Sequence, residues 1–158
     1  MDVCEAVQAI AAGRILLAVE ATRQSRAVIA AAIKRALQSH AEVLVLSVRE
    51  RDYTRGIAWD VRPAGEIAEV VSHAIYELQR VGVPARGLIR TARSGRVADE
   101  ILYTASRHHA DEIVIGKSER SWIGRVLYGS VSPRVLRLAE VPVTAVPTRE
   151  PAGASAQP

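Results

Sequence analysis

The chain has 158 residues, enough for one domain with a hydrophobic core. Hydrophobic residues make up 49% of it and charged residues 24%, a balance that excludes a wholly disordered chain. A single cysteine excludes an internal disulfide and fits a reducing compartment. Because no run of about 18 apolar residues and no secretory leader pattern is present, we expect no membrane partner and a cytoplasmic location.

The formal net charge of +4 raises the question of nucleic-acid binding. The 21 basic residues are scattered along the chain rather than gathered in one block. The aromatic residues are not interleaved with them, as a base-stacking surface would require. The sequence therefore argues against specific nucleic-acid recognition.

In the first half of the chain, short apolar runs alternate with amphipathic stretches. The pattern predicts, in order, a lead over 1–13, a strand over Arg14–Val19, a helix over 23–38, a strand over Glu42–Val48 and a helix over 64–81. Residues 49–63 are polar and turn-forming, so we expect a long surface loop there.

The same alternation continues through the second half. It predicts a strand over Pro84–Ala92, a helix opening at Ser94, a strand over Asp111–Gly116, a helix from about Gly129 and a strand over Val141–Val146. The tail over 148–158 is rich in Pro, Ala, Gly and Ser and is expected to be disordered. One domain is therefore expected over 14–147.

Alternation of buried strands with amphipathic helices predicts the fold class. We expect an α/β, Rossmann-like fold with an open five-stranded parallel sheet and helices on both faces. In such folds, ligands bind outside the carboxyl ends of the strands, where the strand order reverses. The expected site therefore lies beyond the ends of the predicted strands, near Val19, Val48 and Ile115.

One loop-to-helix segment carries the clearest functional pattern. Gly116 ends a predicted strand, and Gly129 with Ser130 opens a helix. Residues Ser130–Ser132 place free backbone N–H groups and hydroxyls at a helix N-terminus, which is suited to phosphate. An ordinary helix, capped by serine after a glycine turn, explains the same pattern without a ligand. The spacing alone leaves both interpretations open.

The segment GKSERSWIGRVLYGSVSPRVLRLAEVPVTAVP closely resembles the C-terminal signature of the universal stress protein family. Nucleotide-binding members of that family carry a G-x2-G-x9-G-S/T pattern, matched here by Gly116, Gly129 and Ser130, with Glu119 at the remaining glycine position. RILLAVEATRQS resembles the family's first strand and acidic turn, with Glu20 where Asp is usual. Val48 matches the hydrophobic position beside adenine.

The resemblance implies a non-enzymatic module of the stress response that binds ATP or another adenine nucleotide, with Mg²⁺. The implied nucleotide site consists of Ala18, Val19, Glu20, Val48, Ile115, Gly116, Glu119, Gly129, Ser130, Val131 and Ser132. A carboxylate at Glu119 would repel phosphate oxygens at close range. The alternative is therefore a nucleotide-free signalling module that acts as a homodimer, which the resemblance implies would pair through Val141–Val146.

The sequence offers no catalytic pair. No general base stands in a recognisable motif with a nucleophile, so we do not expect an enzyme. His108 and His109 are adjacent, and neighbouring residues on a helix point about 100° apart, which argues against a shared metal ion. They are expected to be solvated imidazoles at a helix C-terminus, where the helix dipole favours their charged form.

Overall fold

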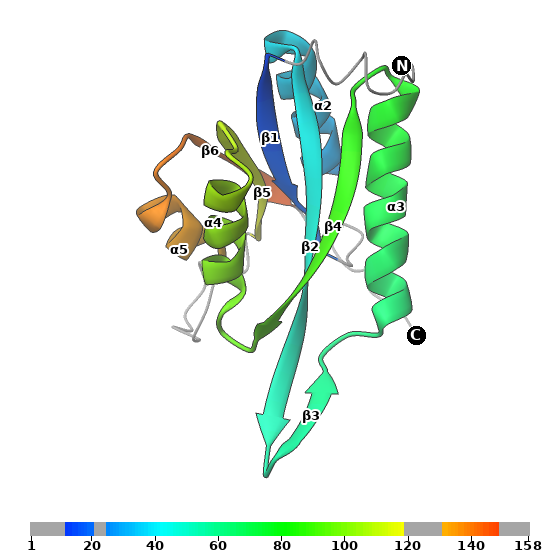
Figure 1. The fold of residues 1–158 in the computed structure, drawn as a ribbon. Helices are drawn as coiled ribbons and strands as arrows, with labels where there is room; N and C mark the ends of the chain where they lie inside the picture. The colour runs from blue at the N-terminus through cyan, green and yellow to red at the C-terminus, as the bar shows by residue number, and fades with distance from the viewer. Residues whose placement is uncertain (1–11, 21–24, 119–130, 149–158) are drawn as a thin grey trace, which may run out of the picture.

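The computed structural model describes residues 12–20, 25–118 and 131–148 (Figure 1). Within them, strands and helices alternate along most of the chain. They are β1 (Gly13–Ala18), α2 (Ser25–Ser39), β2 (Ala41–Thr54), β3 (Ile57–Asp60), α3 (Ala64–Arg80), β4 (Ala85–Arg93), α4 (Val97–Arg107), β5 (Glu112–Ser118), α5 (Val131–Leu138) and β6 (Val143–Thr148).

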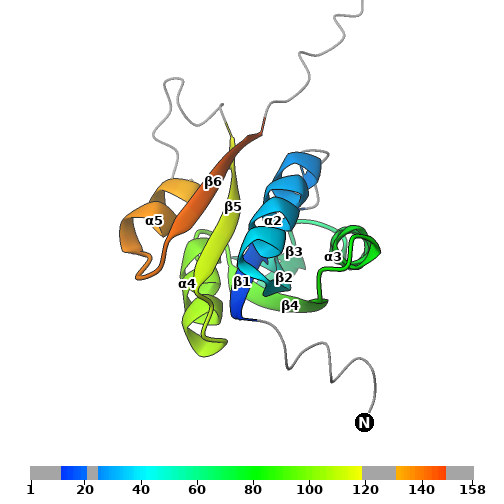
Figure 2. The same ribbon diagram turned by 90° about the horizontal axis from the view of Figure 1, so that it is seen from above.

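Five of the strands form the parallel sheet that the sequence predicts, in the spatial order β4-β2-β1-β5-β6. Helices α2 and α3 cover one face of this sheet, and α4 and α5 cover the other (Figure 2). The predicted α/β fold with helices on both faces is confirmed. A sixth strand, β3, runs antiparallel to β2 and was not predicted.

The core consists of two hydrophobic clusters, one on each face of the sheet. The α2/α3 cluster includes Ile15, Leu17, Val19, Val28, Val43, Val45, Val71, Leu78 and Val114. The α4/α5 cluster includes Leu16, Leu44, Leu46, Ala98, Ile101, Ile113, Ile115 and Val135. Successive side chains of a strand point to opposite faces, so a strand covered on both faces must be apolar at every position. This requirement produces the continuous apolar runs in the sequence.

Gly87 sets the distance between α3 and the sheet. A Cβ atom at this position of β4 would lie 2.5 Å from Val71 Cγ1 and 2.8 Å from Ile75 Cδ1. Real Cβ atoms do not approach other carbons so closely, so the bare glycine backbone lets α3 pack directly on the edge strand.

The expected loop over 49–63 is instead largely a β-hairpin, and that prediction was wrong. Strand β2 continues to Thr54, turns at Arg55 and Gly56 and returns as β3, projecting from the body of the molecule (Figure 1). Arg55 and Gly56 have φ values of 50° and 80°, as a type I′ turn requires. The polar composition reflects exposure of both faces of the hairpin rather than absence of a strand.

The last strand is shifted along the chain from its predicted position of Val141–Val146. Strand β6 begins at Val143 and includes Pro147, whose register partner is Lys117 in β5. A proline is tolerated in an edge strand where its missing N–H would have faced away from the neighbouring strand. Thr148 therefore belongs to the sheet and is buried, whereas the rest of the predicted tail lies outside the described residues.

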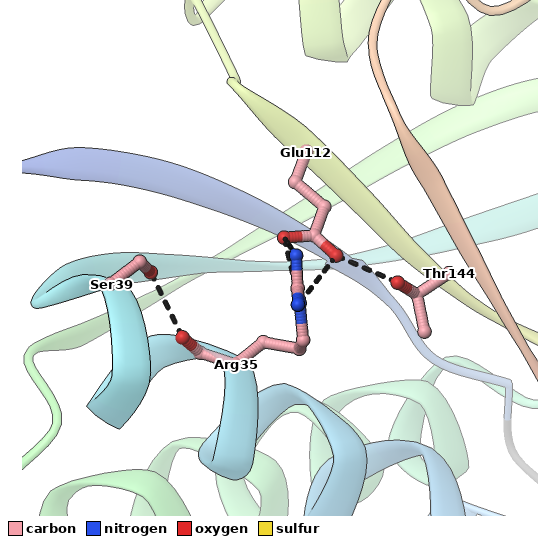
Figure 3. A network of polar contacts seen from close by, with 4 residues as sticks. All are labelled: Arg35, Ser39, Glu112 and Thr144. Carbon is pink, nitrogen blue, oxygen red and sulfur yellow. Dashed lines mark hydrogen bonds and ion pairs between the residues drawn. The ribbon is translucent and has the colours of Figure 1, made fainter.

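A polar network ties α2 to the amino ends of β5 and β6 (Figure 3). The guanidinium of Arg35 donates to both carboxylate oxygens of Glu112 at 2.9–3.1 Å. Thr144 donates its hydroxyl to the same carboxylate at 2.7 Å. Because Glu112 is buried, its charge needs these partners, and they fix the helix against both strands.

Candidate functional site

The central strand β1 ends earlier than the two strands beside it. Its last register partners are Leu46 in β2 and Val114 in β5, whereas β2 continues to Thr54 and β5 to Ser118. The strand order also reverses here, since the chain proceeds from β1 to β2 on one side and reaches β5 on the other. This is the place where α/β sheets bind ligands.

Four of the predicted site residues belong to the α4/α5 cluster or pack against it. Ala18, Val48 and Val131 are partly buried and pack against the α4/α5 cluster, to which the buried Ile115 belongs. They come from the last residue of β1, from the middle of β2 and of β5, and from the first position of α5. The structure thus places partly exposed apolar side chains close to where β1 ends, of the kind that the flat ring of a base can cover.

Val19 and Glu20 follow the end of β1. Val19 is buried in the α2/α3 cluster and donates its N–H to the Leu46 carbonyl at 2.9 Å. Its own carbonyl accepts a hydrogen bond of 3.0 Å from the hydroxyl of Ser47. Glu20 is exposed directly after this anchored residue. The sequence analysis missed Ser47, although a lone hydroxyl residue in the apolar run VLVLSV was the available signal.

Gly116 and Ser132 lie together in the structure and are hydrogen-bonded to each other. The Ser132 hydroxyl donates to the Gly116 carbonyl at 2.6 Å, so this hydroxyl, predicted to face phosphate, holds α5 to β5. A Cβ atom at Gly116 would lie 3.1 Å from Thr148 Cγ2 and 3.2 Å from Val28 Cγ2. Packing of α2 and β6 against β5 therefore accounts for glycine at this position without a ligand.

Three other predicted site residues, Glu119, Gly129 and Ser130, lie outside the described residues. Their predicted contacts with phosphate stay predictions.

A carboxylate bridge holds α5 against α4. Asp99 accepts hydrogen bonds from Arg96, one turn earlier in the chain, at 2.8 Å and from Arg134 in α5 at 3.0 Å. The Arg96 hydrogen bond, followed by the attraction of Arg134, lowers the pKa of Asp99 below its ordinary value. The sequence analysis missed this bridge, which fixes the position of α5 beside the carboxyl ends of the strands.

On the β2–β3 hairpin, arginine side chains stabilise the charge of another carboxylate, that of Asp60. Asp60 accepts a hydrogen bond of 2.8 Å from Arg51 and lies 3.8 Å from Arg49. These contacts lower the pKa of Asp60 below its ordinary value, the hydrogen bond from Arg51 being the largest cause.

Within the described residues, no three His, Cys, Asp or Glu side chains come together as a metal site. None of the described helices is both long and apolar enough to cross a bilayer.

Several solved structures are similar to this one. A universal stress protein from Archaeoglobus fulgidus matches with a TM-score of 0.68 and 24% identity, over 85% of this chain and 98% of that one. A universal stress protein in complex with cAMP matches with 0.67 and 22%, over 88% and 99%. One from Archaeoglobus fulgidus in complex with dAMP matches with 0.60 and 19%, over 87% and 98%. At these identities the likeness shows the fold.

No curated protein matches the chain significantly in sequence. The sequence model of the Universal stress protein family matches residues 12–147, which is most of the chain. With the fold and this match in agreement, the chain belongs to the universal stress protein family.

Proposed function

We propose that the chain binds an adenine nucleotide beyond the carboxyl end of β1, beside the parts of β2 and β5 that continue past it, and serves the stress response as a non-enzymatic binding module in the cytoplasm. The observation that carries this proposal is that Ala18, Val48 and Val131 are partly buried and pack against one hydrophobic cluster, on the α4/α5 face of the sheet. Two similar structures of the family hold cAMP and dAMP, which supports the same class of ligand here.

Each part of the site has a distinct part in this proposal. The apolar surface of Ala18, Val48 and Val131 excludes water from one face of the base. Glu20 offers a carboxylate to a ribose hydroxyl, and the start of α5 offers backbone N–H groups to the phosphates. Mg²⁺ with ATP would neutralise phosphate charge that Glu119 otherwise repels.

Binding is tested by calorimetry on protein stripped of nucleotide, titrated with AMP, cAMP and ATP, the last with and without Mg²⁺. Protein at about 0.1 mM detects any affinity better than roughly millimolar. We expect measurable heat with at least one of these ligands. Absence of heat with all of them would overturn the proposed nucleotide binding.

Two matched substitutions locate the site. Val48→Lys places a charge on the apolar surface, and we expect nucleotide binding to be lost. Leu88→Lys is the control, because Leu88 is also partly buried and packs on the same cluster, but lies on edge strand β4. Equal loss of binding in both variants would argue against the proposed position of the base.

The non-enzymatic part of the proposal has its own test. It is supported by the sequence, which pairs no general base with a nucleophile. We expect release of phosphate or pyrophosphate from ATP to stay at background in a sensitive assay. Turnover that disappears in Val48→Lys and persists in Leu88→Lys would show an enzyme instead.

A nucleotide-free homodimer is the second candidate. It is favoured by β6, which pairs with β5 on one side and has no strand on its other side within the described residues. Pairing of two such edges protects them from uncontrolled association. Glu119→Gly distinguishes the candidates, since gain of ATP binding in this variant alone would identify Glu119 as the residue that blocks the site. A sedimentation experiment that finds only monomer would overturn the homodimer.

A further inference from the structure

The β2–β3 hairpin exposes three large apolar side chains in a row. Ile57 is 68% exposed, Trp59 is 44% exposed and Val61 is 50% exposed. Ile57 and Trp59 stand at alternate positions of β3 and so point to the same face. Val61 follows the last residue of β3 and continues the pattern, because its N–H still bonds to Glu50 of β2. An exposed apolar row of this kind marks a contact with another molecule.

The outer edge of β3 is free among the described strands. The Val61 N–H donates to the Glu50 carbonyl at 2.9 Å, and Trp59 and Ile57 lie opposite Asp52 and Thr54. Backbone groups alternate in direction along an antiparallel strand. The N–H and carbonyl groups of Ala58 and Asp60 therefore point away from β2.

No described strand reaches these outward groups. The Leu46 and Glu50 carbonyls of β2 accept from Val19 and Val61, so β1 and β3 lie along the same edge of β2. Strand β1 ends opposite Leu46, before the hairpin begins. The open edge and the exposed apolar face thus occur on the same short strand.

We propose that β3 pairs with β3 of a second copy of this chain, antiparallel, about a two-fold axis at Trp59. The outward groups of Ala58 in one copy then bond to those of Asp60 in the other, twice by symmetry. This register sets Trp59 opposite its counterpart and Ile57 opposite Val61 of the other copy. The inference goes beyond the proposed nucleotide binding and does not depend on it.

Self-complementarity favours a second copy over an unrelated partner. The register that satisfies the outward backbone groups also places the two apolar rows side by side on one face of the joined sheet. A slip of one residue would instead set apolar side chains opposite charged ones. Asp60 faces Ala58 in this register, so the two Asp60 carboxylates do not oppose each other. Each carboxylate already has Arg51 as its partner at 2.8 Å.

The strand is only Ile57–Asp60 long, so the contact is smaller than a standard interface. We therefore expect a weak, concentration-dependent dimer. Because backbone pairing gives little affinity by itself, the three apolar pairs supply most of the stabilisation.

Cross-linking tests the register directly, in a Cys4→Ser background that removes the natural thiol. We mix Ile57→Cys with Val61→Cys protein under mild oxidation, since the proposed pairing places these two positions directly opposite, within disulfide reach. We expect the mixture to cross-link about ten-fold faster than either variant alone, because identical positions lie far apart along the strands. Equal rates in all three samples would overturn the proposal.

Proline substitutions provide the matched control. Ala58→Pro removes an outward N–H without breaking the β2–β3 ladder, and we expect it to abolish the cross-link. Ala145→Pro does the same to the outer edge of β6, and we expect it to leave the cross-link unchanged. Circular dichroism confirms that each variant is folded. Cross-linking lost with Ala145→Pro and kept with Ala58→Pro would assign the contact to β6 and contradict the proposal.

Discussion

Ser132 donates its hydroxyl to the carbonyl oxygen of Gly116 across 2.6 Å and thereby fastens the first turn of α5 to the carboxyl end of β5. Both residues lie in the segment that resembles the family's nucleotide-binding signature. Gly116 of that signature and Ser132, two residues after its Ser130, therefore have a structural task that a nucleotide-free member of the family would also need.

Ser132→Ala leaves a carbonyl without its donor at a site where the serine is buried. We expect a loss of about 1–2 kcal/mol in the free energy of unfolding. Ser39→Ala is the control, because the Ser39 hydroxyl bonds the Arg35 carbonyl one turn away on an exposed helix end. Urea denaturation measures both. Equal losses of unfolding free energy in the two variants would show that the hydrogen bond between α5 and β5 stabilises the fold no more than an exposed one within a helix.

Gly87→Ala forces a methyl group against Val71 and Ile75, at distances of 2.5 and 2.8 Å before any relaxation. We expect α3 to shift and the free energy of unfolding to fall by roughly 1–3 kcal/mol. Gly65→Ala is the matched control, since nothing lies within 4 Å of its added Cβ and the position is helical. That variant should be neutral or slightly stabilised. Thermal melts measure both variants. A melting temperature of Gly87→Ala equal to that of Gly65→Ala would contradict the close packing of α3 on β4.

Thr104 in α4 buries a hydroxyl that has no hydrogen-bond partner within the described part of the chain. Thr104→Val keeps the shape and removes the unsatisfied group, so we expect stability to rise by about 1 kcal/mol. Thr144→Val makes the same chemical change at a hydroxyl bonded to Glu112 and should lower stability. Differential scanning calorimetry shows whether the melting temperature rises or falls in each variant. A fall in the melting temperature of Thr104→Val would refute the prediction.

His108 departs from the expectation of a solvated imidazole in its charged form. It is partly buried, and burial followed by repulsion from Arg86, Arg14, Arg107 and Arg90 lowers its pKa below 6.5. The unfolded chain accepts the proton near pH 6.5 and the native state only at lower pH, so stability falls as the pH drops through that interval.

His108→Asn should remove this part of the pH dependence. We expect the variant's stability to change less than the wild type's between about pH 6.5 and 5, a range above that in which carboxylates take up protons. Asp60, Asp99 and Glu77 have lowered pKa values, so their contributions are lost only at more acidic pH. His109→Asn, which changes the exposed neighbouring residue, is the control for the substitution itself. Urea midpoints across this range decide the question.

The sequence predicted the parallel sheet because burial on both faces leaves an unmistakable apolar run, as in Ile15–Leu17. It also predicted Ala18, Val48, Ile115 and Val131 as nucleotide-site residues; the structure places all four in or against the α4/α5 cluster, and their contact with a nucleotide stays a prediction. What it missed depends on contacts between distant residues. Ser47 bonding Val19 and Asp99 bonding Arg134 leave no periodic trace.

Charge misled the prediction in the segment after Val48. A strand that leaves the body of the molecule no longer needs apolar residues at every position, and its arginine and aspartate residues then look like loop residues. The Arg55-Gly56 pair marked the turn, and the alternating Ile57, Trp59 and Val61 were the available signal of a strand, but the charged residues around them masked it. Pro147 had the same effect, since proline suggested the end of a strand where the edge position allowed the strand to continue.

Strand β2 joins the most protected and the least protected parts of the molecule in one continuous segment. Val43–Leu46 are buried and paired on both sides, whereas Tyr53 and Thr54 are exposed and paired only with β3. Amide hydrogen exchange along this strand should therefore span two regimes, with the inner amides exchanging only through global unfolding and the outer ones through local opening. The hairpin can therefore open and re-form while the core stays folded, so it is a unit of lower local stability attached to a more stable sheet.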